Sequence, residues 1–167
     1  MFRKMRRIRQ ALSDDVSRGI LMKGTHGVLA LSGDNGYPYA LPISYVYRAG
    51  RLYFHSAGEG HKIDAVRTCE KASFCVVEKD DVVPEEYTTY FRSVIAFGKI
   101  RIIDAEDEKL SAIRALADKY HPKGAPEKRE EAVKREWAHV TVLEMEIEHI
   151  SGKEAIELVK KRAGNEI

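Results

Sequence analysis

The chain has 167 residues, the size of one ordinary domain, and its 44% hydrophobic and 32% charged residues are typical of a folded globular protein. The formal net charge of +2 provides no large single-sign field, so nucleic acid and anionic membranes are not expected as partners. The sequence contains neither a long apolar run that predicts a transmembrane helix nor the apolar core of a signal peptide. Two cysteines do not make a disulfide framework, and we expect a cytoplasmic protein with a single domain over residues 1–167.

The N-terminal segment 1–12 is basic. We interpret it as a solvated or subunit-clasping segment rather than a nucleic-acid arm, because no later part of the chain extends the basic patch. Next, Ser13-Asp14-Asp15 predicts the capped start of an amphipathic helix, and Gly24 predicts its end.

The middle of the chain consists of short apolar runs separated by turn residues. Gly33-Asp34-Asn35-Gly36 predicts a tight turn because glycine and asparagine accept positive φ, and Ala49-Gly50 predicts another. Leu143 alternates with Glu144 and their neighbours repeat this pattern, which predicts a strand with one buried face and one wet face. We expect strands at residues 27–31, 37–47, 51–55, 72–77, 93–103 and 140–150.

Helices are expected between and after these strands, at residues 61–67, 110–120 and 127–136, with a weakly helical tail over 152–167. Asp104 and Asp107 would cap the second of these helices, and the polar residues 78–92, which include Pro84, would form a long loop. Together the elements predict a mainly β fold with flanking helices, in which about six antiparallel strands form a closed or nearly closed barrel.

Residues 56–62 leave a predicted strand and open a helix that begins with His61 and Lys62. Glycines let the backbone approach a ligand, a helix N-terminus offers unpaired N–H groups, and a lysine adds positive charge. The segment is therefore a candidate phosphate cradle, although an unremarkable strand-to-helix turn has the same residues. His55 and His61 lack the further ligands of a metal site, so no metal is expected.

Pro42 lies within a predicted strand, where it cannot donate to the ladder. This position predicts either an edge strand or a place where a flat ligand approaches the backbone. His55 is either a proton-donating group or a packing histidine, and Trp137 is either a packing anchor or a cover for an aromatic ligand.

A series of motifs along nearly the whole chain appears in a characteristic order: Met1-Phe2-Arg3-Lys4-Met5-Arg6-Arg7, Gly27-Val28-Leu29-Ala30, Gly36-Tyr37-Pro38-Tyr39-Ala40-Leu41-Pro42, Leu52-Tyr53-Phe54-His55-Ser56-Ala57, Gly60-His61-Lys62-Ile63-Asp64, Ser73-Phe74-Cys75-Val76, Tyr87-Thr88-Thr89-Tyr90-Phe91-Arg92-Ser93-Val94 and Glu154-Ala155-Ile156-Glu157. In this order they resemble the 5-nitroimidazole-resistance (Nim-type) flavoproteins of the wider pyridoxamine 5′-phosphate oxidase-like group.

The resemblance implies a Greek-key-like split β-barrel that binds flavin mononucleotide (FMN) and works as a homodimer with flavins at the subunit interface. His61 and Lys62 would meet the phosphate, with His61 standing where the related oxidases carry arginine. Ser93 would contact the flavin, and Trp137 would cover the flavin of the partner subunit. The ring would lie along Tyr39, Ala40, Leu41, Pro42, Ile43 and Ser44, with Phe54 and His55 on the next strand.

The primary functional hypothesis is an FMN-dependent reductase of small acceptors such as nitroaromatics, with His55 as the catalytic proton donor or substrate contact. The absence of a nicotinamide-binding fingerprint favours an alternative, a flavin-binding carrier or sensor without turnover. The arginine and histidine pattern of the true oxidases is not evident near the C-terminus, which argues against pyridoxal phosphate as substrate.

Overall fold

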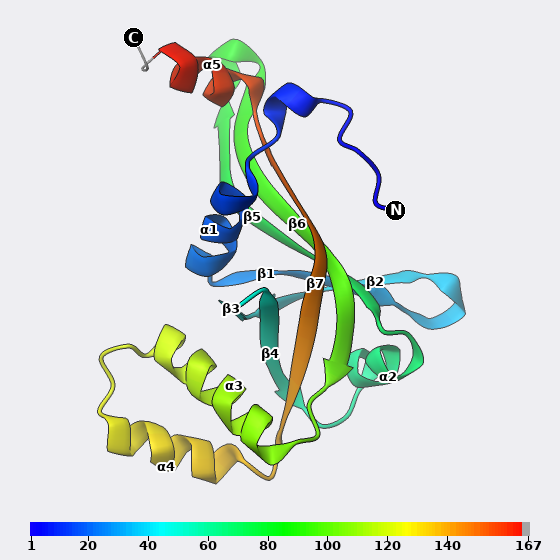
Figure 1. The fold of residues 1–167 in the computed structure, drawn as a ribbon, viewed down its shortest axis with the longest axis vertical. Coiled ribbons are helices and arrows are strands. Elements are labelled where there is room, and N and C mark those ends of the chain that lie inside the picture. Colours follow the sequence, from blue (N-terminus) through cyan, green and yellow to red (C-terminus); the bar gives the residue numbers. More distant parts are fainter. Residues whose placement is uncertain (165–167) are drawn as a thin grey trace.

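Seven strands form one antiparallel sheet in the computed structural model, which describes residues 1–164 (Figure 1). The strands are β1 (His26–Ser32), β2 (Pro38–Ser44), β3 (Val46–Arg48), β4 (Arg51–Ala57), β5 (Lys71–Val83), β6 (Thr88–Ile102) and β7 (Val140–Glu154). Their order in the sheet is β2-β1-β5-β6-β7-β4-β3. The helices are α1 (Asp14–Lys23), α2 (His61–Thr68), α3 (Glu106–Tyr120), α4 (Pro126–Glu136) and α5 (Ile156–Gly164), with 3₁₀ turns η1 (Ile8–Gln10), η2 (Asp34–Gly36) and η3 (Pro84–Glu86).

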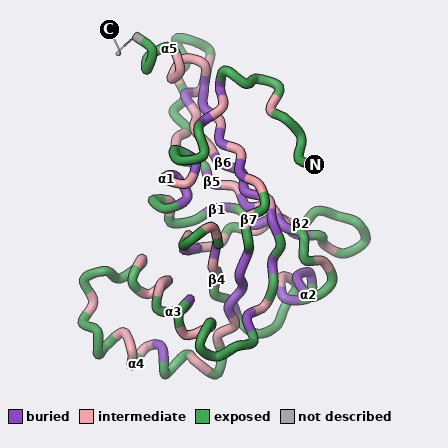
Figure 2. Tube along the Cα trace, viewed as in Figure 1, coloured by how far each residue is buried: buried purple, intermediate pink, exposed green. Residues whose placement is uncertain are grey.

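The sheet is an open barrel. Within residues 1–164, the end strands β2 and β3 each pair with one neighbour only, and β2 contacts β4 across the fold without joining its ladder. Buried residues gather along the strands, whereas α4 is mostly exposed (Figure 2). The mainly β split barrel with flanking helices is thus confirmed. No helix in the described part of the chain combines the length and apolar character needed to cross a membrane.

The strand count is seven rather than the expected six, because the second predicted strand divides at Tyr45. The backbone N–H of Tyr45 donates to the hydroxyl of Tyr120 (2.9 Å), and that hydroxyl donates to the Tyr45 carbonyl (3.0 Å). The buried Tyr45 side chain also donates to the Leu21 carbonyl (2.7 Å). These bonds take Tyr45 out of the ladder, so β2 and β3 end at opposite edges of the sheet.

The polar residues 78–92 are not the expected long loop. They extend β5 and β6 into a two-stranded ribbon whose pairing continues to Val83 and Thr88. Only η3 and Tyr87, which has a left-handed backbone (φ 49°), form the turn. Pro84 lies in that turn, where it needs no ladder bond, and the acidic residues face water on the ribbon.

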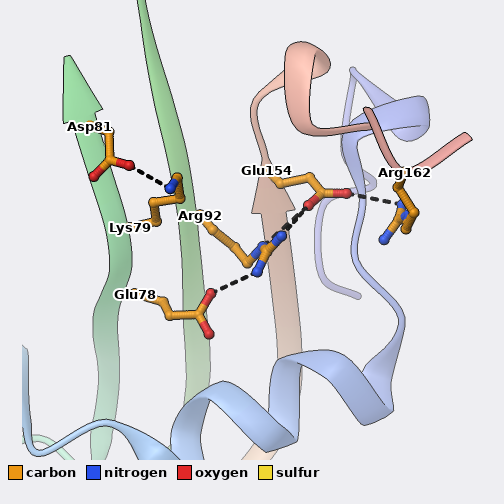
Figure 3. A network of polar contacts seen from close by, with 6 residues as sticks. All are labelled: Glu78, Lys79, Asp81, Arg92, Glu154 and Arg162. Atoms are coloured by element: carbon orange, nitrogen blue, oxygen red, sulfur yellow. Dashed lines mark hydrogen bonds and ion pairs between the residues drawn. The ribbon is translucent and has the colours of Figure 1, made fainter. Parts of the chain in front are cut away.

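A network around the buried Glu154 ties this ribbon to β7 and α5 (Figure 3). Arg92 donates from Nε (3.2 Å) and Nη2 (3.0 Å) to Glu154 Oε2, and from Nη1 to Glu78 (3.0 Å). From α5, Arg162 Nη2 lies 2.9 Å from Glu154 Oε1, an ion pair outside hydrogen-bond geometry. The expected helical tail is seen as α5 from Ile156 onward, but residues 152–154 of that prediction continue β7 instead, and residues 165–167 lie outside the described residues.

Two features differ from what the sequence predicts: the cap of α3 and the exposure of Glu144 on β7. Ser13 caps α1 as expected, accepting from the Val16 N–H (3.3 Å), but α3 follows Ala105 with no side-chain cap. Glu144 is buried rather than wet, because α3 packs over β7 and Arg101 donates to its carboxylate (3.0 Å).

Candidate functional site

The start of α2 lies against the β1–β2 hairpin through His61. The His61 ring stacks on Tyr39 with centroids 4.0 Å apart and planes 18° apart. His61 Nε2 lies 3.5 Å from a carboxylate oxygen of Asp34 in the hairpin turn. That turn is built as its sequence predicts, with Asn35 and Gly36 at positive φ. Asp34, which the sequence did not mark as a site residue, thus supplies a carboxylate beside a predicted phosphate contact.

Lys62 follows His61 and is half-buried. Burial lowers the pKa of its ammonium group, since desolvation disfavours the charged form. None of the ion pairs formed by residues 1–164 includes Lys62. A desolvated ammonium group without a carboxylate partner is strongly stabilised when an anionic ligand binds beside it.

The backbone at the start of α2 offers further donors. Gly60 has φ +111°, and its carbonyl accepts from the N–H groups of Ile63 (2.8 Å) and Asp64 (3.2 Å). No side chain caps this end, so the N–H groups of His61 and Lys62 point out of the first turn unpaired within the described residues. A Cβ on Gly60 would meet nothing within 4 Å, so the space beside these donors is open. These donors and the Lys62 charge fit a phosphate group.

Ser56, at the end of β4, adds a second feature that the sequence did not single out. The residue is 7% exposed, and its hydroxyl oxygen is buried without a hydrogen-bond partner among residues 1–164. Leaving such a group unsatisfied costs about 1–3 kcal/mol. The only sequence signal was its place in the small-residue stretch before Gly60.

The predicted ring site is the strand β2, an edge strand as the position of Pro42 favours. Tyr39, Leu41 and Ile43 pack against the core, whereas Ala40 and Pro42 are exposed on the other face. Ser44 is half-buried at the end of the strand. The outward face of β2 therefore presents small apolar side chains next to an open strand edge.

The two residues expected on β4 have different environments. Phe54 is fully buried, with its ring against that of Phe74 (5.2 Å, 63°), so its side chain belongs to the core. His55 points to solvent. Because β3 pairs with β4 only as far as Tyr53, this edge of β4 is open at both residues.

Ser93 and Trp137 are not brought to this site within one chain. Ser93 lies on β6, which β1 and β5 separate from β2, a distance of ~14 Å at ordinary strand spacing. Trp137 follows α4, held by Lys109, whose Nζ lies 4.4 Å from the ring centroid and donates to the Trp137 carbonyl (3.1 Å). Figure 1 shows α4 on the side of the fold away from α2 and the β1–β2 hairpin.

Two cavities of the single chain lie away from the α2 junction. One of about 440 Å³ lies between α3 and the strands β3 and β4, where Arg48, Arg51 and Tyr53 line it, and one of about 580 Å³ lies between α3 and α4, where Trp137 lines it. The residues at β2 and α2 instead form an open ledge, defined here as Tyr39–Ser44 with Gly60-His61-Lys62. A ligand bound to this ledge would need a cover from outside the chain to be enclosed.

Comparisons with known proteins agree with the fold. The sequence profile of the family described as pyridoxamine 5′-phosphate oxidase matches residues 13–154. Among solved structures, a candidate 5-nitroimidazole antibiotic resistance protein from Bacteroides thetaiotaomicron is 20% identical, with a TM-score of 0.71 over 86% of this chain and 85% of that one. An FAD-binding protein from Mesorhizobium loti is 26% identical (TM-score 0.66; 87% and 97% covered), and an FAD- and heme-binding protein from Mycobacterium smegmatis is 24% identical (0.73; 88% and 73%). No curated protein shows a significant sequence match.

Proposed function

The chain belongs to the pyridoxamine 5′-phosphate oxidase family, and from this premise we propose that it is a flavoprotein that holds the flavin phosphate at Gly60-His61-Lys62. The observation that carries the proposal is Lys62, a desolvated cation without an acidic partner in the described residues, beside two free N–H groups at a helix N-terminus. Solved structures of similar fold include proteins described as FAD-binding. The test is direct: purified protein should be yellow or bind added flavin, and Lys62→Ala should lose that affinity.

We propose FMN as the flavin. Its terminal phosphate carries a charge close to −2 at neutral pH, more than either phosphate within the pyrophosphate of FAD. A single lysine with two N–H donors matches one such terminal group. Titrating the flavin-free protein with FMN, FAD and riboflavin tests the choice, and equal affinity for FMN and riboflavin would contradict the phosphate site.

The proposed ring position is the outward side of β2 beside Ala40 and Pro42, with the open edge of β4 at Phe54 and His55 on the other side. The strand edge offers N–H and C=O groups for the polar rim of the ring. Ser93 and Trp137 cannot complete this site in one chain, so we propose that a partner subunit supplies them.

A homodimer is supported by an apolar row across the outer face of the sheet. The register places Pro42 opposite Val28, Val28 opposite Cys75, and Cys75 opposite Ile95, so four strands contribute to one row. Val28 is 42% exposed and Ile95 39% exposed. Val28→Lys should convert a dimer to a monomer and weaken FMN binding, as measured by light scattering and flavin titration. A monomeric wild-type protein would contradict the proposal.

The activity we propose is reduction of small acceptors such as nitroaromatics. A bound flavin supplies hydride transfer, and the protein binds and orients it. The exposed His55 could hold a proton for the acceptor at a ring nitrogen. His55→Ala should therefore slow turnover while FMN stays bound, and unchanged rates would remove His55 from the mechanism.

The second candidate function is a flavin carrier or sensor without turnover. The absence of a nicotinamide-binding fingerprint in the sequence favours it. Anaerobic mixing of the FMN-loaded protein with reduced nicotinamide cofactor and a nitroimidazole separates the two: reoxidised flavin and reduced nitro compound support the reductase, and unchanged spectra support the carrier.

A further inference from the structure

We propose that Lys153 of each subunit lies beside the flavin ring held by the other subunit, and that its positive charge makes this flavin easier to reduce. The inference rests on the proposed function, in which Ser93 reaches the flavin of the partner subunit. In the sheet register, Lys153 on β7 is directly opposite Ser93 on β6. Residues placed in this way have Cβ atoms about 4.5–5.5 Å apart, so a ligand that touches Ser93 is within reach of the lysine side chain.

Both side chains lie on the outer face of the sheet. In β7, Gly152 and Glu154 are buried on the inner face, and Lys153 between them is half-buried on the other face. In β6, Val94 belongs to the hydrophobic core, so its neighbour Ser93 points outward. Lys153 therefore lies on the same face as the apolar row that supports the homodimer, where a partner subunit would enclose it.

The contacts of Lys153 fix its backbone but leave its charge without a counter-ion. The main chain pairs with Ser93 on one side and forms a bridge to Ala11 on the other. The Nζ atom lies 5.2 Å from the ring centroid of Phe91, which precedes Ser93 by two residues on the same face. None of the ion pairs formed by residues 1–164 includes Lys153. The ammonium group would therefore be stabilised by negative charge that a ligand brings to this face.

A flavin acquires such a charge when it is reduced. Uptake of two electrons with one proton at N5 leaves negative charge at the N1 end of the ring, whereas the oxidised ring is neutral. A nearby ammonium group thus stabilises the reduced form more than the oxidised form. Charge near the ring is one of the means by which a protein tunes a flavin. Lys153 is therefore assigned to the midpoint potential of the flavin, and Lys62 to the affinity for its phosphate.

The test is a redox titration of the FMN-loaded dimer against a reference dye. Lys153→Gln should lower the affinity for reduced FMN relative to oxidised FMN by about tenfold, which for a two-electron couple is a midpoint potential about 30 mV lower. Lys153→Arg keeps the charge and should keep the wild-type potential. Lys23→Gln is the matched control, because Lys23 is an exposed lysine at the end of α1, which packs against the inner face of the sheet. The control should not change the potential.

Mixed dimers test whether the effect crosses the subunit interface. When a Lys62→Ala chain is paired with a Lys153→Gln chain, the remaining flavin lies on the Lys153→Gln chain and faces the unchanged Lys153 of the other chain. This dimer should keep the wild-type potential. A wild-type chain paired with a chain that carries both substitutions should show the lowered potential.

An unchanged potential in Lys153→Gln with FMN bound would overturn the inference and leave the proposed flavoprotein in place. An equal loss in Lys153→Arg would also overturn it, because the charge would then not be the cause. A lowered potential in the first mixed dimer but not in the second would assign Lys153 to the flavin of its own chain, against the inference. Protein that binds no FMN contradicts the proposed function, and the inference with it.

Discussion

Arg92 holds the buried carboxylate of Glu154 with two hydrogen bonds to the same oxygen, at 3.2 and 3.0 Å. Glu154 is only 1% exposed, and it lies where β6, β7 and α5 meet. Removing one member of a buried charge pair leaves the other uncompensated, which costs far more than the pair contributes on the surface.

Glu154→Gln should therefore lower the free energy of unfolding by about 3 kcal/mol in urea titrations. The matched control is Glu146→Gln, because Glu146 has a 65% exposed side chain and only a 3.9 Å contact with Arg51. The control should change stability by less than about 0.5 kcal/mol. If both variants lose a similar free energy of unfolding, burial of Glu154 does not explain the effect of its substitution.

FMN affinity should fall as the pH rises, and this fall should begin at a lower pH than at a lysine with an ordinary pKa. Burial lowers the pKa of Lys62, so the ammonium charge is lost as pH rises through that lowered value, while the phosphate remains a dianion. Flavin titrations from pH 7 to 10 measure this fall. Lys62→Arg keeps its charge throughout and should remove the alkaline fall; the same fall in that variant would assign the titration to another group.

Asp34→Asn should strengthen FMN binding by up to about fivefold, because it removes a carboxylate that competes with the phosphate for His61 and such exposed charges are worth ~1 kcal/mol or less. Asp80→Asn, on the distant β5–β6 ribbon, is the charge-matched control and should have no effect. Weaker binding in Asp34→Asn would instead show that Asp34 orients His61 for the phosphate.

Ser56→Ala distinguishes a merely buried hydroxyl from a ligand contact. If the unpaired hydroxyl only costs folding energy, the variant should be as stable as the wild type or more so, by up to about 1 kcal/mol. We expect this together with unchanged FMN affinity, because the hydroxyl oxygen is shielded from solvent in the described chain. A loss of FMN affinity at unchanged stability would place Ser56 in the flavin site.

The two thiols should differ in reactivity. A hydrogen bond from the Lys71 backbone, helped by one from Ser32, lowers the pKa of Cys69, whereas burial raises the pKa of Cys75. Since the thiolate is the nucleophile, Cys69 should react first with iodoacetamide, and its rate should reach its plateau at a lower pH. Peptide mass spectrometry after timed labelling between pH 6 and 9 measures both rates, and equal rates would contradict the assignment.

Local chemistry made several elements of the fold predictable. The Ser13 cap, the turn containing Asn35 and Gly36, and the edge position of Pro42 each depend on side chains and backbone angles of neighbouring residues. The 78–92 ribbon was mispredicted as a loop because its β5 half, residues 78–83, is exposed or half-buried on both faces, so no apolar alternation marks it.

The candidate site was predictable in its sequence-local part. Gly60-His61-Lys62 combines a strand end, a glycine and a helix start within one segment, so the sequence alone identified it as a possible anion site. Phe54 was placed beside the ring by the family resemblance rather than by local sequence, and the structure adds that the pleat turns its side chain into the core, which leaves only its backbone at the open edge of β4.

The sequence by itself determined most of the helices and strands, the glycine turns and the helix-start donors, because these depend on contacts a few residues apart. Only the tertiary structure decided that Asp34 and Tyr39 flank His61, that Tyr120 splits a strand at Tyr45, and that Arg92 meets Glu154. These partners are 22 to 75 residues apart in the chain. Packing and strand register bring these residues together, and neither can be inferred from the residues next to them in the sequence.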